Sequence, residues 1–160
     1  MINNVETADS GIRALAMNGF AYIEFYVGNV RQVSHYFRTM FSFTPAAFFG
    51  LETGVRDKVS LVLRQGEINL ILTSSLVPNS AIAEHVRLHG DGVKDIAFLV
   101  DDVEVCFHES VSRGAKPVLA PITLTKQGGQ IVKATIGAFG DTVQSFIQCD
   151  KDCELFSPVL

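Results

Sequence analysis

Apolar and other residues alternate in two stretches of the chain that can be laid over one another. The stretch that begins at Ala21 overlies the stretch that begins at Lys94. The matched positions are apolar in both copies: Ile23 with Ile96, Phe25 with Phe98, and Val27 with Val100. Alternation with a period of two is typical of a half-buried β-strand. The sequence therefore predicts one strand in each stretch and an internal repeat that contains both.

An amphipathic helix is predicted directly after each of these strands. Asn29 and Asp102 are good helix N-caps, because their side chains can accept a hydrogen bond from the free N–H groups of the first turn. Apolar residues then recur at helical spacing. They are Val30, Val33, Phe37 and Met40 in the first copy, and Val103, Cys106, Phe107 and Val111 in the second. Gly114 is expected to end the second helix in a left-handed conformation.

Three further strands are predicted after each helix. In the first copy they are Thr44–Phe49, Lys58–Arg64 and Glu67–Thr73, with a hairpin turn at Gln65-Gly66. In the second copy they are Lys116–Leu119, Gln130–Ala138 and Thr142–Gln148, with turns at Gly128-Gly129 and Gly140-Asp141. A short helical segment, Ser80 to Leu88, lies between the copies.

This order predicts an α+β fold made of two βαβββ modules. Strands this short bury little surface on their own, so we expect the two modules to pair and enclose one cavity in a half-barrel. The expected divisions are an N-terminal extension (1–17), module 1 (18–76), a helical connection (77–92), module 2 (93–150) and a C-terminal tail (151–160).

Composition narrows the class of protein. The 160 residues are 48% hydrophobic and 19% charged, with a formal net charge of −4, as expected for a globular protein. The chain has no basic block, so a nucleic-acid partner is not expected. No apolar run approaches the roughly 20 residues of a membrane span, and the first ten residues lack a signal-peptide pattern. The sequence thus predicts a cytoplasmic protein without a membrane partner.

Several stretches resemble one known family. They are Gly50-Leu51-Glu52-Thr53-Gly54, the run from Val59 to Ser75, His89 to Phe98 (HGDGVKDIAF), Arg113 to Pro117, and Phe139 to Thr142. Together they resemble the N-terminal domain of 4-hydroxyphenylpyruvate dioxygenase, a member of the vicinal-oxygen-chelate (glyoxalase and bleomycin-resistance) superfamily. The resemblance runs from about Gly19 to Pro158. Hydroxymandelate synthase shares this domain, so the resemblance covers both enzymes.

The resemblance implies a function for the longer protein. The family converts 4-hydroxyphenylpyruvate and oxygen to homogentisate at an iron(II) that two histidines and a glutamate hold in its C-terminal half. The equivalent positions of this chain are Tyr22, Asp95 and Ser145, a poor donor set for iron(II). We therefore expect no metal, no cofactor and no catalytic residue on this chain, and no activity from it alone. Tyr22, Asp95 and Ser145 remain candidate ligand-binding residues.

Two functions of different classes follow. The chain is first expected to be a non-catalytic, structural half, with the catalytic C-terminal half or a second copy of itself as partner. The alternative is a stand-alone glyoxalase-like module that binds a small aromatic or keto acid between its sheets. A weaker third reading is a metal enzyme with its site across a dimer, for which His85, His89 and Glu84 would be the ligands.

Structural explanations compete with each candidate site. His85 and His89 are four residues apart on a predicted helix, and we expect a solvated helix face there. His35 and His108 are expected on the surface, and Cys106 in the core. Asp95 is expected to point inward and to form a structural hydrogen bond. Glu24 and Glu52 have no carboxylate partner in the sequence for acid–base chemistry.

Overall fold

The computed structural model describes residues 15–126, 129–149 and 155–156. Within them the strands and helices follow the predicted order. The elements of the first module are β1 (Met17–Tyr26), α1 (Val30–Phe41), β2 (Thr44–Phe49), the short 3-10 helix η1 (Leu51–Thr53), β3 (Lys58–Gln65) and β4 (Ile68–Ser75). The linking helix α2 (Ala81–His89) precedes β5 (Gly92–Val100), α3 (Val103–Ser112), β6 (Pro117–Lys126), β7 (Gly129–Gly137) and β8 (Val143–Cys149).

All eight strands belong to one sheet, in the order β2-β3-β4-β1-β5-β8-β7-β6. The strands β1 and β5 pair antiparallel at its centre. Each of them also pairs in parallel with the last strand of its own module, β4 or β8. The two halves of the sheet therefore have the same arrangement, and the prediction of two paired βαβββ modules is confirmed.

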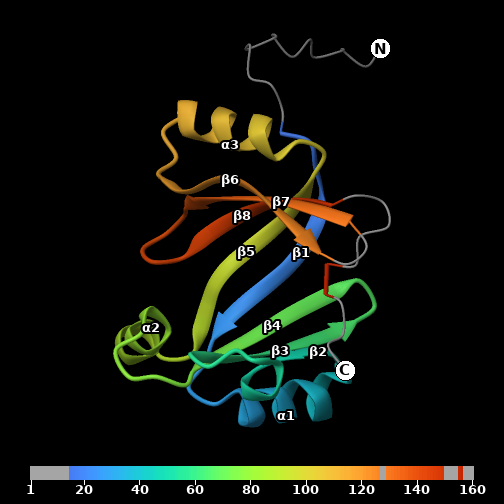
Figure 1. The fold of residues 1–160 in the computed structure, drawn as a ribbon, viewed down its shortest axis with the longest axis vertical. Helices are drawn as coiled ribbons and strands as arrows, with labels where there is room; N and C mark the ends of the chain where they lie inside the picture. Colours follow the sequence, from blue (N-terminus) through green and yellow to red (C-terminus); the bar gives the residue numbers. More distant parts are fainter. Residues whose placement is uncertain (1–14, 127–128, 150–154, 157–160) are drawn as a thin grey trace, which may run out of the picture.

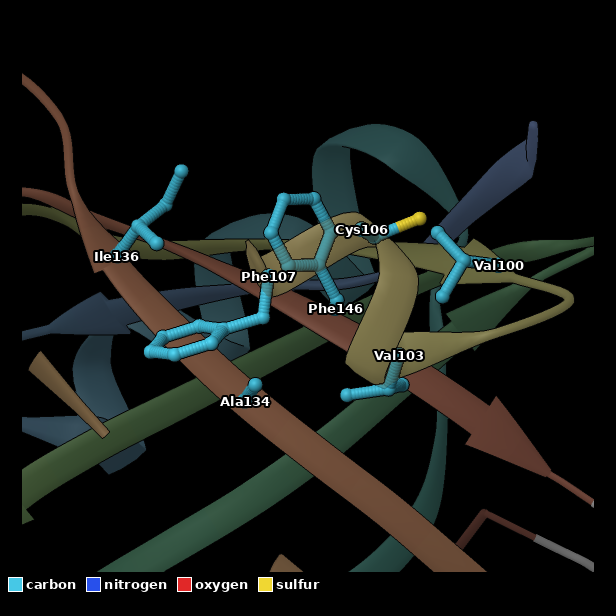
Figure 2. Close-up of a cluster of buried hydrophobic side chains, with 7 residues drawn as sticks. All are labelled: Val100, Val103, Cys106, Phe107, Ala134, Ile136 and Phe146. Carbon is cyan, nitrogen blue, oxygen red and sulfur yellow. The ribbon is translucent and has the colours of Figure 1, made fainter. Parts of the chain in front are cut away.

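Each module has its own hydrophobic core beneath one helix. Figure 1 shows α1 and α3 packed at opposite ends of the molecule, with β1 and β5 crossing between them. Asn29 and Asp102 cap these helices as predicted, accepting hydrogen bonds from the backbone N–H of Gln32 and Val105. In module 2 the core beneath α3 is drawn in Figure 2 and consists of Val100, Val103, Cys106, Phe107, Ala134, Ile136 and Phe146. The corresponding core beneath α1 contains Val27, Val30, Phe43, Leu63, Leu70 and Leu72.

Several details differ from the sequence prediction. Met40, expected on the buried stripe of its helix, has 66% of its surface exposed, because the core beneath α1 is contacted by Val30, Val33 and Phe37, which precede it. Strand β6 extends to Lys126 and is much longer than the predicted Lys116–Leu119, because its pairing with β7 continues past Pro121. Strand β1 begins at Met17, ahead of the predicted repeat.

Some expectations lie outside the described residues. These are most of the N-terminal extension, Gly128 of one predicted turn, and all of the C-terminal tail except residues 155 and 156. Among the described residues, no helix combines the length and the apolar character needed to cross a membrane.

Both outer strands of the sheet carry proline. Pro45 lies in β2 beside a shift in the register with β3. Pro117 begins β6, and its pairing with β7 shifts twice between Pro117 and Ile122. Proline lacks a backbone N–H, so it is tolerated at the edge of a sheet and not in its interior. The residues of β2 and β6 therefore fit their edge positions.

The module 1 core should be sensitive to loss of volume. Leu72 is fully buried, so we expect Leu72→Ala to lower the free energy of unfolding by about 2–5 kcal/mol, from lost transfer energy and the cavity left behind. Met40→Ala, at the exposed end of α1, should change it by less than about 0.5 kcal/mol. Urea unfolding measures both values. Equal losses would contradict the core assignment.

Candidate functional site: the inner face of the sheet

The sheet face opposite α1 and α3, called here the inner face, carries most of the buried polar side chains. Strand alternation places Ile23 and Phe25 against the α1 core, so Tyr22 and Glu24 point the other way. The antiparallel register places Glu24 directly opposite Asp95 on β5. Two carboxylates thus lie side by side at the junction of the modules.

Asp95 is the centre of a hydrogen-bonded group. Its Oδ2 accepts from the Ser145 hydroxyl at 2.7 Å, from the Tyr22 hydroxyl at 3.1 Å and from Lys133 Nζ at 3.3 Å. Lys133 Nζ also donates to the Tyr22 oxygen at 2.7 Å, and Ser145 shares a 2.9 Å hydrogen bond with Thr135. We call these five residues the Asp95 cluster. The other oxygen, Oδ1, is buried and has no hydrogen-bond partner among the described residues.

Glu24 has a similar, smaller set of partners in module 1. Its Oε1 accepts from Thr73 at 2.7 Å, and Thr73 shares a 2.9 Å hydrogen bond with Ser60. Each module therefore supports one carboxylate with a hydroxyl from its last strand, backed by a second hydroxyl from the strand beside it. Burial raises the pKa of Glu24, and the nearby negative charge of Asp95 raises it further.

Tyr22 stays protonated at neutral pH. Burial raises the pKa of its phenol well above the ordinary range, and the charges of Asp95 and Glu24 add to the increase. The three positions that the repeat aligns with the family's iron ligands, Tyr22, Asp95 and Ser145, thus provide a neutral phenol, one carboxylate and a hydroxyl. This set does not suit iron(II), which prefers imidazole and carboxylate ligands. Among the described residues, no group of three His, Cys, Asp or Glu is placed to hold a metal ion.

A cavity of about 1030 Å³ opens beside the Asp95 cluster. Tyr22 borders it, and its other walls are mainly apolar, with polar groups at Asn18, Arg64, Glu67 and Asn69. Arg64 Nε donates to Asn69 Oδ1 at 2.9 Å, and Asn69 is itself bonded to the backbone oxygen of Ala21. Leu155 also lines the cavity, and Phe156 packs edge-on against Tyr22 with ring centres 6.0 Å apart.

The histidine pair on α2 does not lie on a solvated face as expected. His85 is buried, with its ring 5.4 Å from that of Tyr26 and 4.9 Å from that of His89. It is buried because α2 packs across the ends of β1 and β4. His89 remains exposed and contacts Asp141 at 2.9 Å. Glu84, the third suspected ligand, instead forms an exposed ion pair with Arg87.

The sequence located part of this site and missed part of it. Tyr22, Asp95 and Ser145 lie together, and Asp95 points inward, as expected. Lys133 and Thr135 were missed, although both fall in a predicted strand, where an inward lysine is unusual enough to be a signal. No carboxylate partner for Glu24 was found in the sequence, but the structure places it opposite Asp95, and its hydroxyl partner Thr73 was also missed. Cys106 is buried as predicted, while His35 and His108 are exposed.

The architecture defines the class of protein. The structure is similar to methylmalonyl-CoA epimerase from Mycobacterium tuberculosis, with a TM-score of 0.65 over 85% of this chain and 91% of that chain, at 13% identity. It is also similar to a triple mutant of 4-hydroxymandelate synthase from Streptomyces coelicolor. That match has a TM-score of 0.79 and 35% identity and covers 86% of this chain and 40% of the other. The chain therefore has the glyoxalase-like vicinal-oxygen-chelate fold.

Sequence comparison narrows the class to one family. Residues 13–153 match the family described as "Hydroxyphenylpyruvate dioxygenase, HPPD, N-terminal", and the chain belongs to this family. It is 40% identical to 4-hydroxyphenylpyruvate dioxygenase of Dictyostelium discoideum, over 89% of this chain and 39% of the relative. With the Danio rerio enzyme the identity is 39%, over 81% of this chain and 33% of the relative. The chain thus spans between a third and two fifths of these relatives.

Burial of His85 should make stability fall in mild acid. Burial lowers the pKa of His85 from 6.5, and the positive charges of Lys94 and His89 lower it further. The unfolded chain therefore binds this proton first, so stability falls as the pH drops below about 6.5 and levels off below the folded-state pKa.

We expect His85→Phe, which keeps a ring against Tyr26, to show a smaller loss between pH 7.5 and pH 5.5 than the unaltered chain. Urea unfolding at the two pH values gives the comparison. His35→Phe, at an exposed position on α1, is the control and should keep the full pH dependence. If His85→Phe kept it as well, the loss of stability would have to come from other groups.

Proposed function

We propose that this chain is the non-catalytic, N-terminal half of a 4-hydroxyphenylpyruvate dioxygenase-type protein. The observation that carries the proposal is the match of residues 13–153 to the family's N-terminal domain. The chain spans 33% to 39% of the length of the two relatives compared. In the family the iron ligands lie in the other half. The role proposed for this half is to support and orient the catalytic half.

The side chains on the inner face support the proposal that this half is not catalytic. Asp95 Oδ2 accepts hydrogen bonds from Tyr22, Ser145 and Lys133, and a phenol, one carboxylate and a hydroxyl make a poor ligand set for iron(II). The same residues form a hydrogen-bonded junction between the modules. Such a junction suits a half that supports its neighbour more than one that turns over substrate.

Joining the two halves tests the proposal. A chimera would carry this chain in place of the corresponding N-terminal part of the Dictyostelium discoideum relative. We expect the chimera to bind one iron(II) and to consume oxygen with 4-hydroxyphenylpyruvate, and the 160-residue chain alone to do neither. Chromatography should identify the product as homogentisate, as expected from the catalytic half of the Dictyostelium discoideum relative. Iron binding and oxygen uptake by the chain alone would refute the proposal.

The cavity on the inner face favours a second function, binding of a small aromatic 2-oxo acid. Its volume of about 1030 Å³ is at the upper end of the usual range for a small-molecule site. Tyr22, Phe20 and Leu99 would contact an aromatic ring, and the Arg64 guanidinium would pair with the carboxylate. In this proposal Tyr22 contacts the ligand, while Asp95 and Ser145 hold the Tyr22 hydroxyl in place.

Calorimetry with phenylpyruvate and 4-hydroxyphenylpyruvate tests this second function. We expect saturable heat from the unaltered chain and binding weaker by about tenfold or more after Arg64→Gln, because one charge-assisted pair is worth about 1.5–3 kcal/mol. Arg38→Gln, on the last turn of α1, removes the same charge away from the cavity and should bind normally. The second function would be abandoned if no heat appeared, or if both variants weakened binding equally.

A further inference from the structure

Lys133 is an unusual cation for the interior of a sheet. Its side chain is only 25% exposed, and its ammonium contacts both Asp95 and the Tyr22 oxygen. The ammonium also lies 5.5 Å from the centre of the Tyr22 ring. A buried lysine normally loses stability by desolvation unless its charge is paired. Here the protein holds the charge among groups from three strands, β1, β5 and β7.

The charges around this ammonium explain why it is needed. Asp95 is 5% exposed as a side chain, and Glu24 lies directly opposite it across the β1–β5 pair. Two carboxylates this close destabilise one another unless a cation lies near both. Lys133 and Lys58 are the cations whose charges act on Glu24, and Lys133 is the one that contacts Asp95.

The ammonium contacts two of the three residues that the repeat aligns with the family's iron ligands. Tyr22 and Asp95, two of the three positions that correspond to iron ligands of the family's catalytic half, are its direct partners. The third, Ser145, bonds to the same Asp95 oxygen. A divalent cation placed among these groups would be repelled by the ammonium and would find a neutral phenol in place of an anionic or imidazole ligand.

We propose that the Lys133 ammonium is a built-in cation that occupies the metal position of this module and makes its inner face independent of any metal. The lysine neutralises the Asp95–Glu24 pair, fixes the Tyr22 hydroxyl and keeps divalent ions out. This assignment rests on the contacts of Lys133 and on the alignment of Tyr22, Asp95 and Ser145 with the family's iron ligands, and it does not depend on the proposed function. It holds for a structural half and for a ligand-binding module alike.

The first test removes the charge and keeps the length of the side chain. We expect Lys133→Met to lower the melting temperature at pH 7.5 by about 5 °C or more, since an unpaired buried carboxylate is costly. The loss should shrink at pH 5, because burial raises the pKa of the neighbouring Glu24, which then takes up a proton more readily. Lys116→Met, which removes the same charge from an exposed position, is the control and should have little effect at either pH.

A double variant separates charge pairing from simple packing. Asp95→Asn in the Lys133→Met background removes both charges, so we expect it to recover most of the lost stability. Additive losses from the two substitutions would overturn the proposal. The double variant also serves if Lys133→Met proves too unstable to purify.

A third measurement tests the position as a cation site. Lys133→Ala leaves room for a small ammonium ion, so millimolar methylammonium should raise its melting temperature more than sodium at equal ionic strength. The same addition should not affect Lys133→Met, whose side chain fills the space. Equal effects of methylammonium and sodium on Lys133→Ala would count against a cation site. Stoichiometric binding of Mn²⁺ by the unaltered chain would overturn the proposal outright.

Discussion

Antiparallel pairing of β1 with β5 joins the two modules, and its register decides which groups meet on the inner face. Glu24 lies opposite Asp95, and Tyr22 reaches Asp95, because of this alignment. A slip of one residue would turn each of these side chains toward the helices. The two hydrophobic cores hold the register from the other face, with Phe25 and Ile23 packed beneath α1.

The sequence predicted the elements well, because each depends on local pattern. Alternation located β1 and β5, and Asn29 and Asp102 located the helix starts. The predictions were wrong where tertiary contacts decide the outcome. Strand β6 is longer than predicted because β7 pairs with it. Met40 is exposed because α1 extends past the core. His85 was assigned to the wrong environment for the same reason, since helical spacing does not reveal which face packs on the sheet.

The candidate site was predicted only in part, because its members come from different strands. Tyr22, Asp95 and Ser145 could be named from the repeat and the family resemblance. Lys133 could have been noticed as an inward lysine, but its contact with Tyr22 could not be predicted, since it crosses 111 residues of sequence and depends on the order of β1, β5, β8 and β7. The matching hydroxyl pairs of the two modules were also missed, because a single sequence offset does not align them. Ser60 meets Thr73, and Thr135 meets Ser145, only through the pairing of neighbouring strands.

The proline-bearing outer strands limit how this unit can meet other molecules. A sheet grows by strand addition only if its edge offers a regular row of backbone donors and acceptors. Pro45 interrupts that row in β2, and Pro117 and Pro121 interrupt it in β6, beside the register shifts that twist each edge. The prolines therefore make continuous main-chain pairing along either edge less favourable. Assembly with a second copy or with a catalytic half would rely mainly on side-chain surfaces, whose composition can change without disturbing the eight-stranded sheet.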